Sequence, residues 1–346
     1  MEAVVIKRIC GILFVFVVLQ CVQSSPAAAQ DSNPCIAITT VWYPDPTPVG
    51  WSYYGPYPGT YAYAIWAWKA TCAPPANREP CPHCPSASKP VSLATGNVYI
   101  EQSDVRVPGL SGGLQLTRTW NSQWPSTQSA SQVGLFGPNW RSTYEEKVFT
   151  GGDYYLKYSR SDGSFWSFGT TSTTPGSWAL AAPQNVAATL TTPSTATPYW
   201  TITFQNGEQR RFDGTSGMLT AIIDRNGNTT TLTYDGANRL VTITDPASRH
   251  LYFGYGSTSS HLVTSVTSDV AISLSYAYDG QNRISQVTNP DLTTISFGYD
   301  SQSRIISVTD MNGKILESHT YDSNGRGLTS SRAAGVESVT LSYPTP

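Results

Sequence analysis

Charged side chains are scarce in this sequence. Lys and Arg number 21 and Asp and Glu number 23, so that only 13% of the 346 residues are charged, and the net charge is −2. A protein that grips nucleic acid through its phosphates needs a basic stripe, and this balance supplies none. We therefore expect no nucleic-acid partner.

Familiar catalytic motifs are missing as well. The four histidines (His83, His250, His261 and His319) are dispersed, and no nucleophile elbow, phosphate-binding loop or HExxH motif occurs. We predict that the protein is not an enzyme, with no catalytic residue, no cofactor and no metal. The Cys81-Pro-His-Cys84 motif keeps a zinc or redox site open as an alternative.

The sequence also lacks an apolar run long enough for a firm membrane span, which needs about 20 residues. Lys7 and Arg8 precede an apolar run over 9–22, and small residues at 27–29 suit a signal peptidase. We predict a signal peptide over 1–29 that is cleaved before Gln30, with a retained anchor as the alternative. The mature chain is then secreted or at the cell surface, without a stable membrane span.

Four cysteines remain after cleavage: Cys35, Cys72, Cys81 and Cys84. An even number in an exported protein favours disulfides, and four cysteines allow three connectivities. A CxxC pair can also be half a zinc site or a redox dithiol. The surrounding prolines oppose the helix that would lower a thiol pKa, so structural disulfides are the preferred interpretation.

What is abundant is a repeat. Tyr-Asp followed four residues later by Arg recurs in the C-terminal third, and with the degenerate members at 212, 255 and 343 the intervals are 22, 21, 23, 21, 22 and 22 residues. Such a period marks units that bury their apolar faces only against neighbours. The signature residues are Tyr234, Asp235, Arg239, Tyr278, Asp279, Arg283, Tyr299, Asp300, Arg304, Tyr321, Asp322 and Arg326.

Each unit fits two strands of about six residues joined by polar turns. Residues two and four before each Tyr are mostly apolar and share one face of a strand, as Leu251 and Phe253 do. Glu317 with His319, and Glu208 with Arg210, break this rule, and we expect a more exposed or irregular face there. We interpret Tyr, Asp and Arg as ladder, cap and ion-pair residues of the turns.

These units resemble the YD repeats of Rhs proteins, toxin-complex shell subunits and teneurins, as in Tyr299-Asp300-Ser-Gln-Ser-Arg304. The stretches 90–122 and 134–140 resemble the domain that precedes the repeats in many bacterial Rhs proteins. The resemblance covers roughly 88–346, and it implies β-hairpin strips that spiral into a hollow shell, often around a C-terminal toxin. The Asp-Pro-x-Gly cleavage signature of toxin-releasing members is absent, so self-cleavage has no support.

We therefore predict an all-β fold, in which tandem hairpin repeats form a curved open sheet or partial shell after a β-rich N-terminal domain. Residues 89–169 form the pre-repeat domain, and we expect its two strands between residues 94 and 120 to be a plug or cap that shields the first repeat. A Ser/Thr/Pro-rich linker or loop covers 170–198, and the repeat array covers 199–346, where it is truncated relative to full shells.

Residues 30–88 are a separate region rich in Pro, Trp, Tyr and Cys. Packing is favoured there over a binding face with Trp51 and Trp66 as ligand-contact aromatics, and a partly disordered linker remains an alternative.

We expect an exported, non-enzymatic structural or interaction protein in a bacterial periplasm or extracellular space, and in one interpretation a fragment of a toxin-encapsulating shell. Its partners would be another Rhs chain, a toxin domain, or a glycan or protein surface. The alternative function is a carbohydrate-binding or adhesive cell-surface module.

Overall fold

The computed structural model describes residues 91–93, 95–123, 133–150, 155–170, 177–182, 186–332, 335 and 337–343, together with the backbone of four strands earlier in the chain. The described residues form an all-β fold, and their one helical element is the short 3-10 turn η1 (Leu110–Gly112). The predicted fold class is confirmed. Within these residues no helix has the length and apolarity needed to span a membrane.

The chain divides into two units, residues 1–72 and 73–346. In the first unit, β1 (Ile36–Trp42), β2 (Ser52–Pro56) and β3 (Ala64–Ala70) form an antiparallel sheet with β3 at its centre. Trp66 lies in β3 opposite Thr40.

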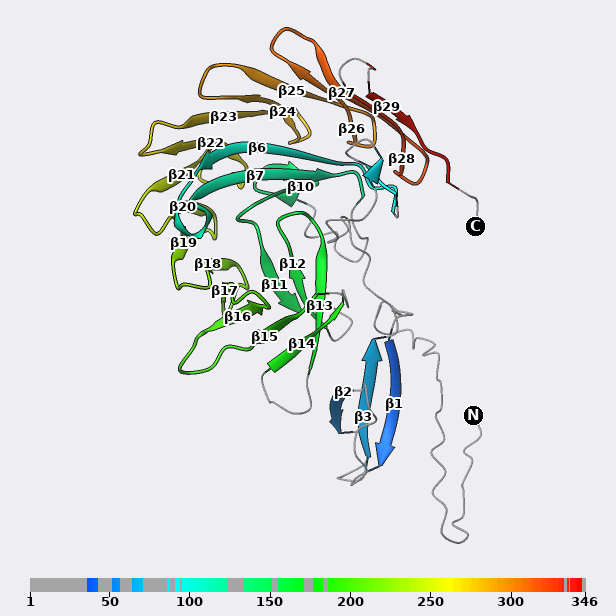
Figure 1. Cartoon of the computed structure of the whole chain (residues 1–346), viewed down its shortest axis with the longest axis vertical. Coiled ribbons are helices and arrows are strands. Elements are labelled where there is room, and N and C mark those ends of the chain that lie inside the picture. The colour runs from blue at the N-terminus through cyan, green and yellow to red at the C-terminus, as the bar shows by residue number, and fades with distance from the viewer. Residues whose placement is uncertain are drawn as a thin grey trace. The chain divides into compact units, whose positions relative to one another are not determined.

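The second unit is built on one open antiparallel sheet of 19 strands that follow one another in chain order. The last eleven strands run side by side in Figure 1, from the yellow-green β19 to the red β29. The strands are β11 (Lys147–Thr150), β12 (Leu156–Ser159), β13 (Phe165–Thr170), β14 (Ser177–Ala182), β15 (Ala188–Thr191), β16 (Tyr199–Phe204), β17 (Gln209–Asp213), β18 (Leu219–Ile223), β19 (Thr229–Tyr234), β20 (Leu240–Thr244), β21 (His250–Tyr255), β22 (Val263–Ser268), β23 (Ser273–Tyr278), β24 (Ile284–Thr288), β25 (Thr294–Tyr299), β26 (Ile305–Asp310), β27 (Ile315–Tyr321), β28 (Gly327–Arg332) and β29 (Glu337–Thr340).

The linker predicted over 170–198 is wrong for two of its segments. Strands β14 and β15 lie inside it and pair with each other and with both flanking strands. Leu190 is fully buried. Alternation of Ala188 and Leu190 with polar Thr189 and Thr191 is a strand pattern, but the Ser, Thr and Pro around it obscured that pattern.

Alternation explains the strands of the repeats. In β21, Leu251 and Phe253 are buried while Tyr252 between them is exposed. At Glu317 and His319 the exposed face is not found, because the His319 side chain is fully buried and that of Glu317 is only 14% exposed, but the irregular alternative is found, since the pairing of β26 with β27 shifts register between Val308 and Thr309. The polar side chains of this strand therefore lie on the inner face of the sheet, and that face is not exposed to solvent.

The first strands of the sheet curl back onto a later turn. The Val148 N–H donates to the Gly217 carbonyl at 2.9 Å, and the Leu219 N–H donates to the Glu146 carbonyl at 3.2 Å. Gly217 has a φ of +68°, and a Cβ there would lie 1.9 Å from the Val148 oxygen. Only glycine allows both this backbone conformation and the close approach.

A smaller sheet covers the concave side of the repeats. Strands β6 (Tyr99–Val107) and β7 (Leu114–Asn121), here called the inner hairpin, pair with β10 (Trp140–Ser142) in the order β10-β7-β6. Short pairs join β4 (Ser86–Ala87) to β5 (Val91–Ser92) and β8 (Val133–Gly134) to β9 (Gly137–Pro138). Figure 1 shows the cyan inner hairpin lying across the repeat strands.

The inner hairpin was expected to shield the first repeat, and this placement is wrong. The packing is with later repeats, because Phe136 contacts Tyr276 edge-on at 4.9 Å and Trp140 contacts Phe297 at 5.4 Å between ring centroids. The Gly327 N–H also donates to the Gly96 carbonyl at 2.8 Å. The pre-repeat segment thus fills the inner face of the array over several units.

Candidate functional site: the turn ladder and the inner anchor

The signature aspartate organises its own turn. Oδ1 of Asp300 accepts the backbone N–H of Gln302 and of Arg304, both at 2.9 Å. The Ser303 N–H donates to the Asp300 carbonyl at 3.1 Å, and Ser303 has a φ of +63°. This geometry is a type I turn closed by a left-handed residue, a common three-residue hairpin loop. Asp235, Asp279 and Asp322 make the same two Oδ1 contacts.

The second oxygen of each aspartate is used by the arginine four residues later. The Arg Nε donates to Asp Oδ2 at 2.7 Å in the pairs Arg239 with Asp235, Arg283 with Asp279, Arg304 with Asp300 and Arg326 with Asp322. Hydrogen bonds from the Arg239 backbone and side chain lower the pKa of Asp235. Burial opposes ionisation of Asp279, but the hydrogen bonds from Arg283 prevail and lower its pKa.

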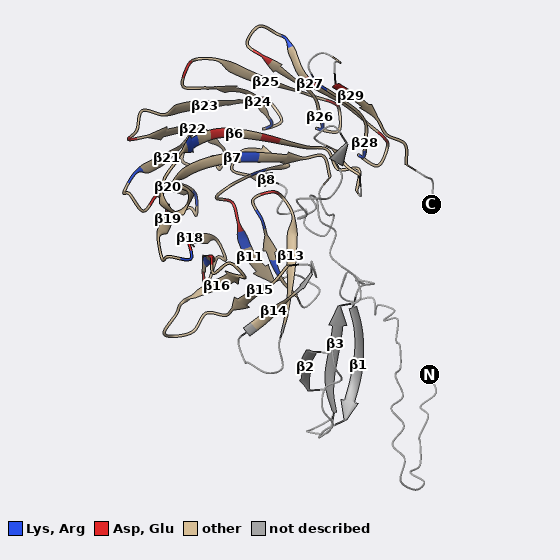
Figure 2. Ribbon diagram, viewed as in Figure 1, with Lys and Arg blue, Asp and Glu red and all other residues tan. Residues whose placement is uncertain are grey.

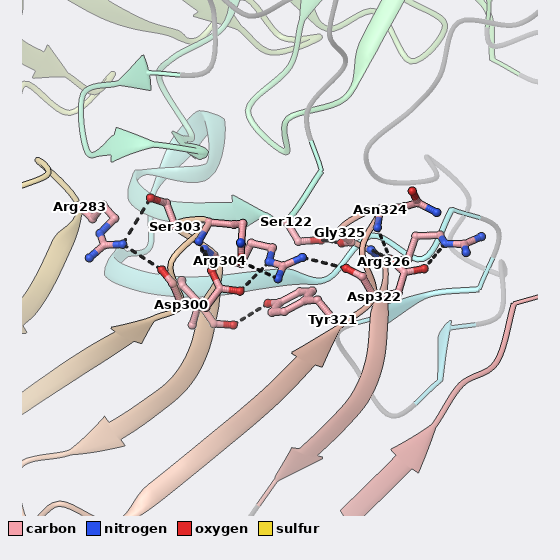
Figure 3. A network of polar contacts seen from close by, with 12 residues as sticks. Ser122, Arg283, Asp300, Ser303, Arg304, Tyr321, Asp322, Asn324, Gly325 and Arg326 are labelled. Carbon is pink, nitrogen blue, oxygen red and sulfur yellow. Dashed lines mark hydrogen bonds and ion pairs between the residues drawn. The ribbon is translucent and has the colours of Figure 1, made fainter.

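Each arginine also reaches into the next unit. Nη1 of Arg304 donates to the Asp322 carbonyl at 3.0 Å, as Figure 3 shows. The guanidinium groups stack over the next tyrosine ring, a cation–π arrangement. The distances to the ring centroids are 4.7 Å for Arg239 over Tyr255, 4.5 Å for Arg283 over Tyr299, 4.7 Å for Arg304 over Tyr321 and 4.2 Å for Arg326 over Tyr343.

The tyrosine completes the link by donating its hydroxyl to the preceding hairpin. The acceptor is a backbone carbonyl 15 or 16 residues earlier, which in most units directly follows the stacked arginine. The bonds are Tyr234 to Leu219 at 2.7 Å, Tyr255 to Leu240 at 2.8 Å, Tyr278 to Val263 at 2.6 Å, Tyr299 to Ile284 at 2.9 Å, Tyr321 to Ile305 at 2.6 Å and Tyr343 to Gly327 at 2.7 Å. Burial raises the pKa of Tyr299 to about 12.

We call this series of contacts the turn ladder: Asp closes a turn, Arg binds that Asp and the next turn, and the next Tyr lies under the Arg. In each signature triplet the structure pairs Asp with Arg, and it places Tyr299 under Arg283 and Tyr321 under Arg304, whereas Arg239 and Arg326 reach the degenerate members Tyr255 and Tyr343. Both oxygens of every signature carboxylate accept hydrogen bonds, which leaves them poorly suited to proton transfer or metal binding. What the arrangement does chemically is fix the spacing of consecutive hairpins.

Turns at the opposite end of the strands use the same device, and the sequence reasoning missed the one at Asp245. Asp245 caps the N–H groups of Ala247 and Arg249, and Arg249 Nε returns to its Oδ2 at 2.8 Å. Nη2 of Arg249 also donates to the Pro108 carbonyl of the inner hairpin turn at 3.0 Å. The Asp-to-Arg spacing of four was the available signal, because it equals the spacing in the signature.

The inner hairpin is anchored by a buried ion pair. Arg118 is fully buried on β7, where its Nη2 donates to Asp104 Oδ1 at 2.8 Å. The Tyr276 hydroxyl, from β23 of the array, donates to the other Asp104 oxygen at 2.7 Å. The Arg118 guanidinium lies 4.8 Å over the Trp140 ring. Burial would lower the pKa of Arg118, but Asp104 outweighs it and the pKa is raised.

We call Asp104, Arg118 and Tyr276 the inner anchor. In the sequence, Arg118 is only one residue of the stretch 90–122, and no expectation joined it to Asp104 or Tyr276. Asp104 and Tyr276 are 172 residues apart, and no local pattern indicates that they meet.

A second buried polar group lies at the start of the sheet. Oε2 of Glu146 accepts the Tyr158 hydroxyl at 2.7 Å and Arg210 Nε at 3.2 Å. Around it, Tyr158 contacts Trp166 at 5.7 Å and Phe212 at 5.7 Å, and Trp166 contacts Phe204 at 5.8 Å. We call these four rings the aromatic cluster. Arg210, expected on an exposed face, instead serves this group, with its side chain only 17% exposed.

Several predicted residues cannot be placed in a site. Cys35, Cys72, Cys81, Cys84 and Trp51 lie outside the described residues. Trp66 is described only by its place in β3. Among the residues that the structure does describe, no three His, Cys, Asp or Glu side chains gather as a metal site would require.

Two family models match the sequence. A domain of unknown function (DUF6531) matches residues 88–168, and the RHS Repeat matches residues 213–250 and 278–315. The repeat matches coincide with turn-ladder units. They support an Rhs/YD-repeat assignment for the segments that they cover. No curated protein matches this chain.

Solved structures with some likeness to this chain include toxin-complex proteins. The Photorhabdus luminescens Tc holotoxin pore matches with a TM-score of 0.29 and 14% identity, over 68% of this chain and 14% of that one. A TcdB2–TccC3 structure without its hypervariable C-terminal region gives 0.31 and 16%, over 72% and 15%. A TcdB2–TccC3–Cdc42 structure gives 0.28 and 15%, over 65% and 14%. This chain thus spans about one seventh of the length of those proteins.

Proposed function

We propose that this chain is an exported, non-enzymatic structural or interaction protein whose repeat array is a rigid curved wall. The observation that supports this proposal most directly is the turn ladder. It orders a turn through one Asp–Arg ion pair and joins it to the next hairpin through a tyrosine hydroxyl bond, to which four of the links add an arginine–tyrosine stack. Such fixed spacing is what a wall needs, because each hairpin contacts only its neighbours.

The inner anchor supports a wall with a filled inner face. Asp104, Arg118 and Tyr276 join the pre-repeat segment to the middle of the array, so the two parts act as one body there. Removing one partner of a buried ion pair is strongly destabilising. The pre-repeat segment should therefore stay packed against the array. We propose that the pre-repeat segment holds the curvature of the wall.

We further propose that the array is a segment of the kind from which a toxin-encapsulating shell is built. The partners would then be another Rhs chain, a toxin domain, or a surface of protein or glycan. The repeat-family match supports a structural role of this type. The apolar run over 9–22 with its preceding basic pair supports export to the periplasm or beyond.

Export and rigidity can be tested together on the full chain expressed in a bacterium with its own N-terminus. We expect to find the protein in the periplasm or the medium. Its intact mass should equal that of a chain whose first residue is Gln30. Amide hydrogen exchange should show β19 to β28 protected in common with β6 and β7. A cytoplasmic, unprocessed chain would overturn export, and rapid exchange throughout the repeats would overturn the rigid wall.

A further inference from the structure

The turns on one margin of the sheet expose apolar side chains. This margin lies opposite the turn ladder and holds the turns that join β18 to β19, β20 to β21, β22 to β23, β24 to β25 and β26 to β27. Val270, Leu292 and Met311 lie in the last three of these turns, and Ile315 begins β27. Figure 1 shows these three loops following one another along the margin.

The turn of the inner hairpin adds a fifth apolar side chain on the same margin. Leu110 lies in η1, and Nη2 of Arg249 donates to the Pro108 carbonyl just before η1 at 3.0 Å. The Asp224 carboxylate accepts the backbone N–H of Ser111, which also belongs to η1. These two contacts place η1 against the first two turns of the margin. We define the apolar rim as Leu110, Val270, Leu292, Met311 and Ile315.

The apolar rim concentrates the exposed apolar surface of the described residues. Of their eight exposed large apolar side chains, five belong to the rim, and none of the eight lies in a turn of the turn ladder. Single exposed apolar residues are ordinary, whereas a group of them marks an interaction surface. Consecutive turns on this margin are two strands apart, so the apolar tips recur about every 9.6 Å.

Leu292 is the most exposed member of the rim, and its backbone is unusual. The residue is 77% exposed, and its φ of +65° lies in the left-handed region. The equivalent position in the two neighbouring turns holds Ala271 and Gly313. The left-handed conformation costs a leucine free energy, and an exposed side chain recovers none of it by packing. A residue that breaks a local rule without a structural gain indicates a function.

We propose that the apolar rim binds the same rim of a second copy of this chain. A row of apolar tips at a fixed spacing is matched by a partner with the same spacing, and a second copy has it. The turns of Val270 and Met311 lie at equal distances on either side of Leu292, so a two-fold axis at Leu292 brings like turns together. Leu292 then meets the partner's Leu292, and Val270 meets the partner's Met311.

The charges beside the apolar tips fit this arrangement. Asp269 lies in the turn of Val270 and Lys314 follows the turn of Met311, and both are exposed. Figure 2 shows the red and blue of the loop that joins β26 to β27. The two-fold axis brings Asp269 toward the partner's Lys314, so opposite charges meet on both sides of it.

The acidic residue nearest the axis is held within its own turn. Oδ1 of Asp291 accepts the N–H of Thr293 at 3.1 Å and the Thr293 hydroxyl at 2.7 Å. These bonds spread part of the negative charge over the turn and reduce repulsion between the two copies.

A second copy fits the rim better than a lipid surface does. Surfaces that insert into membranes are rich in Trp, Lys and Arg. Each of the five turns on this margin holds one aspartate, whereas they hold only three basic residues: Arg225, Arg249 and Lys314. The excess of negative charge opposes binding to anionic lipids. The inference rests on the apolar rim alone, so it does not depend on the array being part of a shell.

The test is sedimentation velocity of the full chain over a range of concentrations. The central variant is Leu292→Asn, because asparagine tolerates the left-handed conformation and removes the apolar tip. The matched control combines Leu292→Asn with Asn238→Leu. It moves the leucine to an exposed turn of the turn ladder, where φ is +59°, and keeps the composition of the chain.

We expect the natural protein to form a dimer with a dissociation constant in the micromolar range. Leu292→Asn should raise this constant at least tenfold, and the matched control should not restore the dimer. Val270→Asp and Met311→Lys should each weaken the dimer about tenfold. The two changes in one chain should recover most of the affinity, because the introduced charges then attract each other across the axis.

The inference is overturned if the natural protein is monomeric throughout the micromolar range, or if Leu292→Asn leaves the dimer unchanged. It is also overturned if the paired charge variant is as weak as the single variants. Binding of a monomeric natural protein to phosphatidylcholine vesicles, lost in Leu292→Asn, would assign the rim to a lipid surface instead. Thermal unfolding confirms that each variant is folded, and Leu292→Asn should unfold at no lower a temperature than the natural protein.

Discussion

The two halves of the 19-stranded sheet are held together in different ways. From β11 to β18 the strands surround the aromatic cluster, and Glu146 joins Tyr158 and Arg210 inside it. From β19 onward the inner face is mainly aliphatic, with one aromatic residue in some strands, and the turn ladder runs along one edge. The first half has contacts that occur once, whereas the second half repeats one set of contacts.

The comparison shows why one half is periodic in sequence and the other is not. A contact that each hairpin makes with the next must recur in every unit, so its residues recur at the same spacing. The aromatic cluster gathers residues from β12, β13, β16 and β17 around one point, and nothing requires them to repeat. The inner anchor is where the pre-repeat segment joins the periodic half.

The largest effect is expected at the inner anchor. Arg118→Ala leaves the buried Asp104 with only the Tyr276 hydroxyl, and we expect the free energy of unfolding to fall by about 3–5 kcal/mol. Urea unfolding monitored by circular dichroism measures this change. Arg225→Ala, at an exposed turn, is the control and should change stability by less than about 0.5 kcal/mol.

The double variant Asp104→Asn with Arg118→Met sharpens this result. It removes both charges, so it should recover part of the stability lost in Arg118→Ala. If the single and double variants lose the same amount, Arg118 acts through packing on Trp140 and not through its charge.

A smaller effect is expected inside the aromatic half. Tyr158→Phe keeps the ring contacts and removes one hydrogen bond to the buried Glu146, and it should lower stability by about 1–3 kcal/mol. Burial and then the Glu146 charge raise the pKa of Tyr158 far above its ordinary value, so this hydroxyl stays protonated at all usable pH. Unchanged stability in urea unfolding would contradict the role of this hydroxyl.

In the repeat half, each single contact of the turn ladder should contribute less to the free energy of unfolding. The losses caused by removing two distant contacts should be additive. Tyr234→Phe and Tyr321→Phe each remove one hydroxyl bond to a backbone carbonyl, with an expected loss of about 1 kcal/mol. The two sites are separated by two other signature tyrosines and the degenerate member Tyr255, so the double variant should equal the sum within about 0.5 kcal/mol. A clearly larger loss in the double variant would show that the repeats do not act as independent neighbours.

The smallest effect concerns acid. The pKa values of Asp279 and Asp322 are lowered in the folded protein, so their contribution is present above the unfolded value of about 3.9 and is lost as the pH falls through the folded values. Asp279→Asn should therefore destabilise the protein at pH 7 by less than about 1 kcal/mol, because this pair is partly exposed. The difference from the natural protein should shrink below pH 4. A difference that grows in acid has the wrong sign for this account.

The fold class could be read from the sequence because hairpin repeats express their pairing locally. Alternation at Leu251 and Phe253 indicated the strand faces, and the recurring Tyr-Asp with Arg four residues later indicated the turns. Strands β14 and β15 were missed because Ser, Thr and Pro are common in linkers. The same residues are also common at the outward positions and in the turns of this sheet. Only pairing with a neighbouring strand distinguishes a strand of this composition from a linker.

The inner anchor could not be predicted, since Asp104 and Tyr276 belong to segments with no shared pattern. His319 was assigned to an exposed or irregular face because it interrupts an apolar alternation, and it is 2% exposed in a strand pair whose register shifts. Local polarity predicts exposure only when nothing else covers the strand, and coverage is a property of the whole fold. The turn at Asp245 was readable in principle, because its spacing to Arg249 equals that of the signature.

The central claim is that the turn ladder couples each repeat to the next, and a double-mutant cycle on Arg304 and Tyr321 tests it most directly. The variants are Arg304→Met, Tyr321→Leu and the pair, with stability measured by urea unfolding, and Arg239 with Tyr321 is the non-neighbouring control. The account predicts a coupling of about 0.5–1 kcal/mol for the neighbours and none for the control. Equal values for the two cycles would contradict it.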